Sequence, residues 1–160
     1  MQWHENNNSP AEIGNGELGC RATYQRTNIP YYHNNEKRTN ILMTESEILA
    51  RLAAQALEEK KGIDVKIMDL RGLLSAPTSF FVIASGNVPS HVSALSDHVH
   101  EIIKKATGLN PSKVEGYANA EWILMDYFDV VVHIFQQSKR DFYRLEQLWE
   151  DGTIIEFSEK

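Results

Sequence analysis

Apolar residues recur at helical spacing only after residue 42. From Thr44 onward, apolar side chains three and four positions apart predict a first helix that ends near Gly62. A second stretch with this spacing covers residues 92–106, and a third begins after Ser138, which we expect to be its N-cap. The pattern therefore predicts three helices, each with one apolar face that packs against another layer.

Four other segments have the composition of strands: residues 65–70, 79–85, 121–127 and 130–135. The second is almost continuously apolar, which is typical of a central strand that is buried on both faces. The last two are close enough to form an antiparallel hairpin with its turn at Phe128 and Asp129. A short final strand is expected near residues 153–156. This order predicts a single α/β domain whose mixed sheet is flanked by helices.

Residues 1–42 are different in character. Eight of the eleven asparagines lie there, and four acids balance four bases, so the net charge of −6 belongs entirely to residues 43–160. The segment resembles neither a secretory signal nor an organelle transit peptide. We expect either a disordered extension or an artefact of start-site choice, with Met43 as the initiator.

The folded domain is expected to begin directly after Met43. Residues 44–47 read Thr-Glu-Ser-Glu, the pattern of a capping box. In this motif the Thr44 hydroxyl accepts a hydrogen bond from the backbone N–H of Glu47, and the Glu47 carboxylate reaches back to Thr44.

Composition narrows the function classes. The 160 residues are 42% hydrophobic and 24% charged, which is ordinary for one globular domain, and no run of 18 apolar residues predicts a membrane span. A single cysteine fits a reducing, intracellular compartment. The net charge of −6 argues against direct binding of nucleic acid through its phosphates. A neutral or basic protein partner is therefore favoured.

The chain offers little for catalysis. Ser85-Gly86 leads from a strand into a helix and is the one candidate for holding a phosphate, so nucleotide binding or nucleotidyl transfer remains an alternative. Asp126 and Asp129, however, are three residues apart, whereas paired metal ligands on one strand are two apart. His91 and His98 are better explained as surface side chains than as metal ligands. We expect no catalytic residues, no cofactor and no metal.

Aromatic and acidic residues gather on the predicted hairpin and the last helix. Trp122 shares one strand face with Asp126, so that face is not expected to be fully buried. An exposed tryptophan beside carboxylates is typical of a protein interface. His133, on an apolar strand, is more often a core or interface residue than a catalytic base.

Several blocks in order resemble one family. They are Asp69-Leu-Arg71, Ser79-Phe-Phe-Val-Ile-Ala-Ser-Gly86, Val114-Glu-Gly116, Trp122-Ile-Leu-Met-Asp-Tyr-Phe-Asp-Val-Val-Val-His133 and Arg140-Asp-Phe-Tyr-Arg-Leu-Glu-Gln-Leu-Trp149. Together they resemble the ribosomal silencing factors, also called Iojap-like proteins, over about residues 44–151. Family members usually have a short acid, glycine or asparagine near position 128, where this chain has Phe128.

The resemblance implies a nucleotidyltransferase-like fold without catalytic carboxylates. It also implies a bacterial cytoplasmic protein, often a homodimer, that docks on the large ribosomal subunit through its protein numbered fourteen and blocks joining of the small subunit when nutrients are short. Carried over to this sequence, the expected contact residues are Trp122, Asp126, Tyr127, Asp129, His133, Arg140 and Tyr143, with Trp122 as the apolar anchor and the two aspartates facing basic side chains.

Overall fold

The structure is a computed structural model that describes residues 22–24, 30–32 and 43–155. The chain divides into two units, and in the first of them β1 (Ala22–Tyr24) and β2 (Pro30–Tyr32) pair antiparallel. Sequence analysis did not predict this pair, since three-residue strands leave no periodic pattern. The rest of the predicted extension lies outside the described residues.

The second unit holds the predicted helices and strands. Its elements are, in chain order, α1 (Glu45–Glu59), β3 (Ile63–Asp69), β4 (Phe80–Gly86), α2 (Pro89–Thr107), β5 (Lys113–Glu115), β6 (Trp122–Asp126), β7 (Val130–Gln136), α3 (Gln137–Tyr143), α4 (Leu145–Leu148) and β8 (Thr153–Ile155). Only β5 was not predicted. None of the helices among the described residues has the length and apolarity of a membrane span.

The six strands of this unit form one mixed sheet in the order β5-β6-β7-β4-β3-β8. β4 and β7 run parallel, and every other neighbouring pair is antiparallel, including the predicted hairpin of β6 and β7. All seven residues of β4 are buried, which confirms that it is the central strand. The predicted fold class, a mixed sheet flanked by helices, is therefore confirmed.

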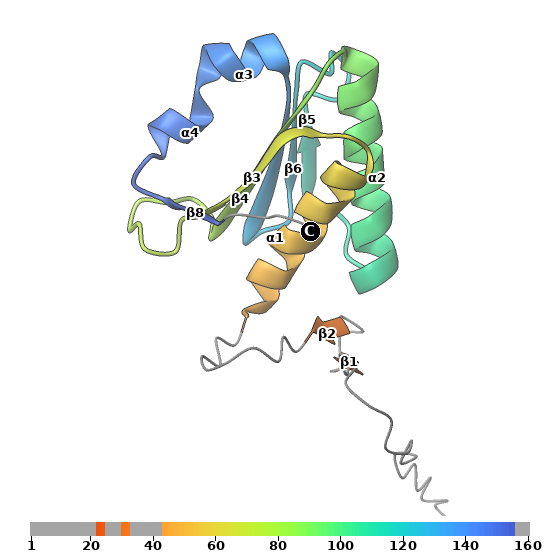
Figure 1. Cartoon of the computed structure of the whole chain (residues 1–160), viewed down its shortest axis with the longest axis vertical. Helices are drawn as coiled ribbons and strands as arrows, with labels where there is room; N and C mark the ends of the chain where they lie inside the picture. The colour runs from red at the N-terminus through yellow and green to blue at the C-terminus, as the bar shows by residue number, and fades with distance from the viewer. Residues whose placement is uncertain (1–21, 25–29, 33–42, 156–160) are drawn as a thin grey trace, which may run out of the picture. The chain divides into compact units, whose positions relative to one another are not determined.

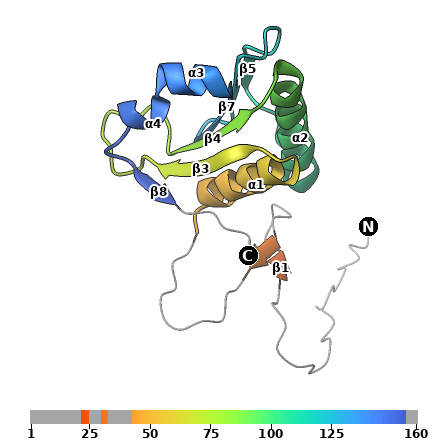
Figure 2. The same ribbon diagram turned by 45° about the horizontal axis from the view of Figure 1, so that its top comes forward.

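Helices cover the two faces of the sheet unequally. Figure 1 and Figure 2 show α1 and α2 side by side on one face, and the short α3 and α4 on the other. The larger core lies under α1 and α2, where it includes Phe80, Val82, Val132 and Ile134. A smaller apolar cluster under α3 and α4 contains Met68, Leu70, Phe81, Ile83, Phe135 and Leu145.

The prediction of one continuous last helix was wrong. α3 begins after Gln136, so Ser138 lies inside the first turn and is not the N-cap. The helix ends at Arg144, whose φ of 47° is left-handed, and α4 follows at once. After this break, Leu145 packs into the smaller apolar cluster. Burial of Leu145 therefore outweighs the strain at Arg144.

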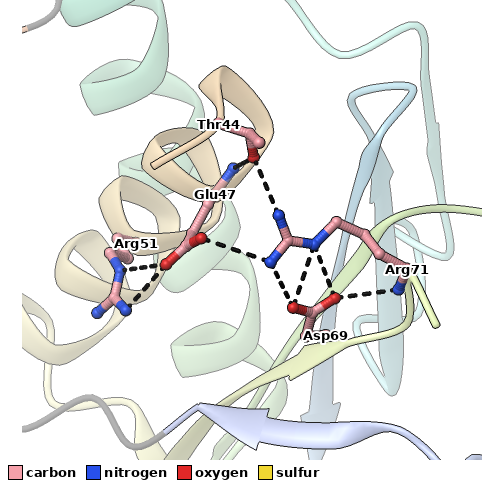
Figure 3. A network of polar contacts seen from close by, with 5 residues as sticks. All are labelled: Thr44, Glu47, Arg51, Asp69 and Arg71. Carbon is pink, nitrogen blue, oxygen red and sulfur yellow. Dashed lines mark hydrogen bonds and ion pairs between the residues drawn. The ribbon is translucent and has the colours of Figure 1, made fainter. Parts of the chain in front are cut away.

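Polar contacts fasten the start of α1 to the end of β3 (Figure 3). The backbone N–H of Glu47 donates to the Thr44 hydroxyl at 3.2 Å, as the capping box predicts. The other half of that prediction was wrong, because the Glu47 carboxylate lies 3.1 Å from Arg51 and 3.6 Å from Arg71 instead. Charge-assisted contacts to two guanidinium groups are stronger than one to a backbone N–H.

Arg71 is the link between the two elements. Its guanidinium donates to both carboxylate oxygens of Asp69, and this bonding lowers the pKa of Asp69 and raises that of Arg71. The guanidinium also lies 4.7 Å from the centre of the Phe80 ring. The buried Glu47 thus joins helix α1 to Arg71, just after the end of β3.

We predict that Glu47→Ala lowers the free energy of unfolding by about 1 to 2 kcal/mol, because it removes a buried carboxylate that accepts hydrogen bonds from Arg51 and pairs with Arg71. Urea denaturation measures this difference. Glu45→Ala is the matched control, since Glu45 is an exposed carboxylate in the same turn of α1. Equal losses in the two variants would contradict a specific role for Glu47.

Candidate functional site

The face of the sheet under α3 and α4 is only partly covered at strand β6. Ile123, Met125 and the following Tyr127 are buried on the α1 and α2 side, whereas Trp122, Leu124 and Asp126 are half-buried on the other. This confirms the prediction from strand alternation that the face with Trp122 is not fully buried. The candidate site is built on that face.

Four aromatic side chains lead from the core to the surface there, and we call them the aromatic ladder: Phe135, Trp122, Tyr143 and Phe142. Trp122 stacks on the buried Phe135 with ring centres 4.9 Å apart, and Tyr143 lies 4.9 Å from Trp122. Phe142 meets Tyr143 edge to face at 5.1 Å. Tyr143 is 48% exposed and Phe142 76% exposed, so the outer half of the ladder is open to solvent.

Trp122 is held from two sides. Its indole N–H donates to Nδ1 of His133 at 3.2 Å, and His133 is only 3% exposed. Its backbone passes close to Gly116, whose φ is 77° and where an added Cβ would lie 1.9 Å from the Trp122 carbonyl oxygen. A glycine is therefore required at position 116 for Trp122 to occupy this place.

Burial lowers the pKa of His133 to about 4. The ring packs against Phe81 and Phe135, with no charged group among its ring contacts in the described residues. The imidazole is therefore neutral at physiological pH, and its Nδ1 is free to accept the hydrogen bond from Trp122.

The two predicted aspartates lie at the hairpin turn, at the far end of β6 from Trp122. Asp126 accepts a hydrogen bond from the backbone N–H of Phe128 at 2.7 Å, and Asp129 accepts one from the Ser46 hydroxyl at 3.3 Å. Phe128 has a left-handed φ of 67° and is 75% exposed. Asp129 is exposed and Asp126 half-buried, so both carboxylates contribute negative charge at this turn.

Two of the predicted contact residues lie elsewhere. Tyr127 is buried under α1 and α2, and burial raises its pKa to about 12. Arg140 is 5% exposed and contacts Asp64 and Glu146 while donating to the Ser85 hydroxyl at 3.1 Å. Arg140 therefore holds α3 against the ends of β3 and β4, and its guanidinium does not face solvent.

The structure thus brings together three of the seven predicted residues, Trp122, His133 and Tyr143. It places the two aspartates apart from them at the turn. Phe142 lies inside the predicted contact stretch from Arg140 to Tyr143 and is the most exposed member of the ladder. The sequence pattern places Phe142 with Leu145 and Leu148 on the apolar face of a single last helix, so its exposure was not predicted.

The candidate phosphate site is occupied by the chain's own groups. The Ser85 side chain is buried against Arg140, and the backbone N–H of Asn87, just before α2, donates to Nδ1 of His91 at 3.2 Å. Among residues 22–24, 30–32 and 43–155, no cluster of three or more His, Cys, Asp or Glu side chains is arranged to hold a metal ion.

Comparison with known proteins decides the family. A family model described as "Ribosomal silencing factor during starvation" matches residues 43–160. The chain belongs to the ribosomal silencing factor family. It is 35% identical over 114 residues to the ribosomal silencing factor RsfS of Halalkalibacterium halodurans, an alignment that covers 71% of this chain and 95% of that protein.

Two further comparisons extend this result. The Iojap protein of Zea mays, named as chloroplastic, is 34% identical over 105 residues, which are 64% of this chain and 44% of that protein. A crystal structure of a protein from Chromobacterium violaceum has a TM-score of 0.63 at 34% identity, covering 73% of this chain and 95% of the other. The resemblance to silencing factors and Iojap proteins is therefore confirmed.

We predict that His133 makes stability depend on pH. Its folded pKa of about 4 lies below the ordinary 6.5, so the unfolded chain binds a proton first, and stability present above pH 6.5 is lost as the pH falls toward 4. The loss should be about 2 to 3 kcal/mol between about pH 7.5 and 4.5. Urea denaturation across this range should give a flatter curve for His133→Asn, and parallel curves would contradict the assignment.

We predict that Phe128→Asn raises the free energy of unfolding by about 0.5 to 1 kcal/mol, because asparagine tolerates a left-handed φ better and little burial is lost. Thermal melting checks this as a rise of a few degrees. Leu74→Asn is the control, since Leu74 is fully exposed and is not among the residues with positive φ. A lower melting temperature for Phe128→Asn would show that the ring stabilises the fold.

Proposed function

We propose that this silencing factor docks on the large ribosomal subunit through its protein numbered fourteen and sterically blocks joining of the small subunit, lowering translation when nutrients are short. Family membership supports the silencing role. The proposal places the protein in the bacterial cytoplasm, acting by binding and without catalysis. Residues 43–160, which the family model covers, form the docking domain.

The observation that carries this proposal is the aromatic ladder on the partly covered face of the sheet. Tyr143 and Phe142 present apolar rings to solvent while Trp122 and Phe135 fix them to the core. Rigid aromatic side chains lose little conformational entropy on binding and commonly provide most of the binding energy at protein interfaces. A partner with a shallow apolar spot would cover this surface.

Charge favours a basic partner. Residues 43–160 carry the whole net charge of −6, and Asp126 and Asp129 at the β6–β7 turn are two of the acids that contribute to it. Basic proteins are common in ribosomes, and complementary charge raises the association rate. In this proposal Asp129 and Asp126 face basic side chains of the ribosomal protein.

The structure changes the role of Trp122 within the proposal. Because the indole is half-buried between the core and Tyr143, Trp122 supports the ladder, and Tyr143 and Phe142 make the apolar contact. His133 and Arg140 are buried, so they act through the side chains that they contact, whereas Tyr127 belongs to the core on the opposite face.

We predict that Phe142→Ala and Tyr143→Ala each weaken binding to isolated large subunits about tenfold, because each removes an exposed aromatic contact. Co-sedimentation of the full chain with large subunits measures the affinity. Adding small subunits should then give fewer joined particles with the unaltered chain than with either variant.

Leu109→Ala is the matched control. Leu109 is half-exposed just after α2, the helix that covers the opposite face of the sheet, so its loss should leave both measurements unchanged. Affinity of Phe142→Ala and Tyr143→Ala equal to that of the control would remove the ladder from the docking surface. Failure of the unaltered chain to sediment with large subunits would reject the proposed function itself.

A further inference from the structure

His133 is a buried polar side chain, and among the described residues only one of its two ring nitrogens has a hydrogen-bond partner. The side chain is 3% exposed, and its Nε2 has no hydrogen-bond partner in the part of the chain that the structure describes. A buried N–H without a partner costs free energy that an apolar residue of similar size, such as leucine, would avoid. Packing alone therefore does not explain a histidine at this position in β7.

Its other ring nitrogen has a directional contact. The indole of Trp122 has one N–H, which only donates, and it points at Nδ1 of His133 at 3.2 Å. Nδ1 must therefore accept, which fixes the neutral tautomer with its proton on Nε2. In the sheet, Trp122 pairs with Phe135, two residues along β7 from His133 on the same face, so the bond runs diagonally between the strands.

The hydrogen bond from Trp122 to His133 fixes the orientation of the indole, which stacking alone does not. Phe135 stacks on the indole and Tyr143 packs against it with a tilted ring, and such apolar contacts are satisfied by more than one orientation of the indole. A hydrogen bond is directional and selects the orientation in which the N–H points toward β7. Tyr143 rests on Trp122, so the position of the exposed outer ladder depends on that choice.

We propose that His133 is a positioning residue whose Nδ1 fixes the Trp122 indole in the one orientation that presents Tyr143 and Phe142 to the ribosomal partner. This rests on the proposed function, since it concerns the same docking surface. His133 touches no partner itself. His133 matters because its Nδ1 accepts the hydrogen bond from Trp122, in the inner part of the aromatic ladder.

Three substitutions in the full chain separate positioning from packing. His133→Leu removes the acceptor, and His133→Asn keeps one, because its Oδ1 is bonded to Cγ as Nδ1 is. Trp122→Phe keeps a ring in the stack but has no N–H to donate. The measurements are affinity for isolated large subunits and the exchange rate of the Trp122 indole N–H, followed by NMR and assigned from its absence in Trp122→Phe.

His133→Leu should speed indole exchange and weaken binding about fivefold to tenfold, the effect of one neutral hydrogen bond, without lowering the melting temperature. His133→Asn should restore both readings to within about twofold of the unaltered chain. In the Trp122→Phe background, His133→Leu should no longer change affinity, because there is no N–H left to position.

The proposal is overturned if His133→Leu speeds indole exchange but binds like the unaltered chain, or if it weakens binding equally in the Trp122→Phe background. Should His133→Leu fail to fold, His133→Met replaces it as the variant without a ring acceptor. If the unaltered chain does not bind large subunits at all, the proposed function fails, which is a different result from binding that is indifferent to position 133.

Discussion

Burial of β4 on both faces is the constraint on which the architecture depends. All seven of its residues are buried, so the sheet must be covered on both sides. α1 and α2, with 15 and 19 residues, cover one face, whereas α3 and α4 have only seven and four residues for the other. The shorter pair leaves the β6 end of that face half-covered. The aromatic ladder reaches solvent there, so the candidate site follows from unequal covering of one sheet.

The short helices need anchors, because a helix of seven residues is not stable by itself. Arg140 is the main one, since its buried guanidinium joins α3 to the start of β3, to β4 and to Glu146 in α4. Replacing a partner of such a buried charge is costly. This arrangement fixes the position of α3, which carries the exposed Phe142 and Tyr143.

Sequence periodicity predicted most of this fold because the helices and strands are long enough to repeat their pattern. The alternation Trp122, Leu124, Asp126 also identified the half-covered face before the structure did. Periodicity failed at Arg144, where one left-handed backbone angle ends α3 and separates it from α4. The family resemblance implied contact roles for Arg140 and Tyr127, but their burial depends on neighbours that are distant in sequence.

The central claim is that the face bearing β6 and α3 is the docking surface. Hydrogen exchange of the full chain, measured peptide by peptide with and without isolated large subunits, tests it most directly. The account predicts slower exchange in β6 and α3, around residues 122–126 and 137–143, with α1 and α2 unchanged. Protection confined to α1 and α2 would show that the opposite face binds and would contradict the account.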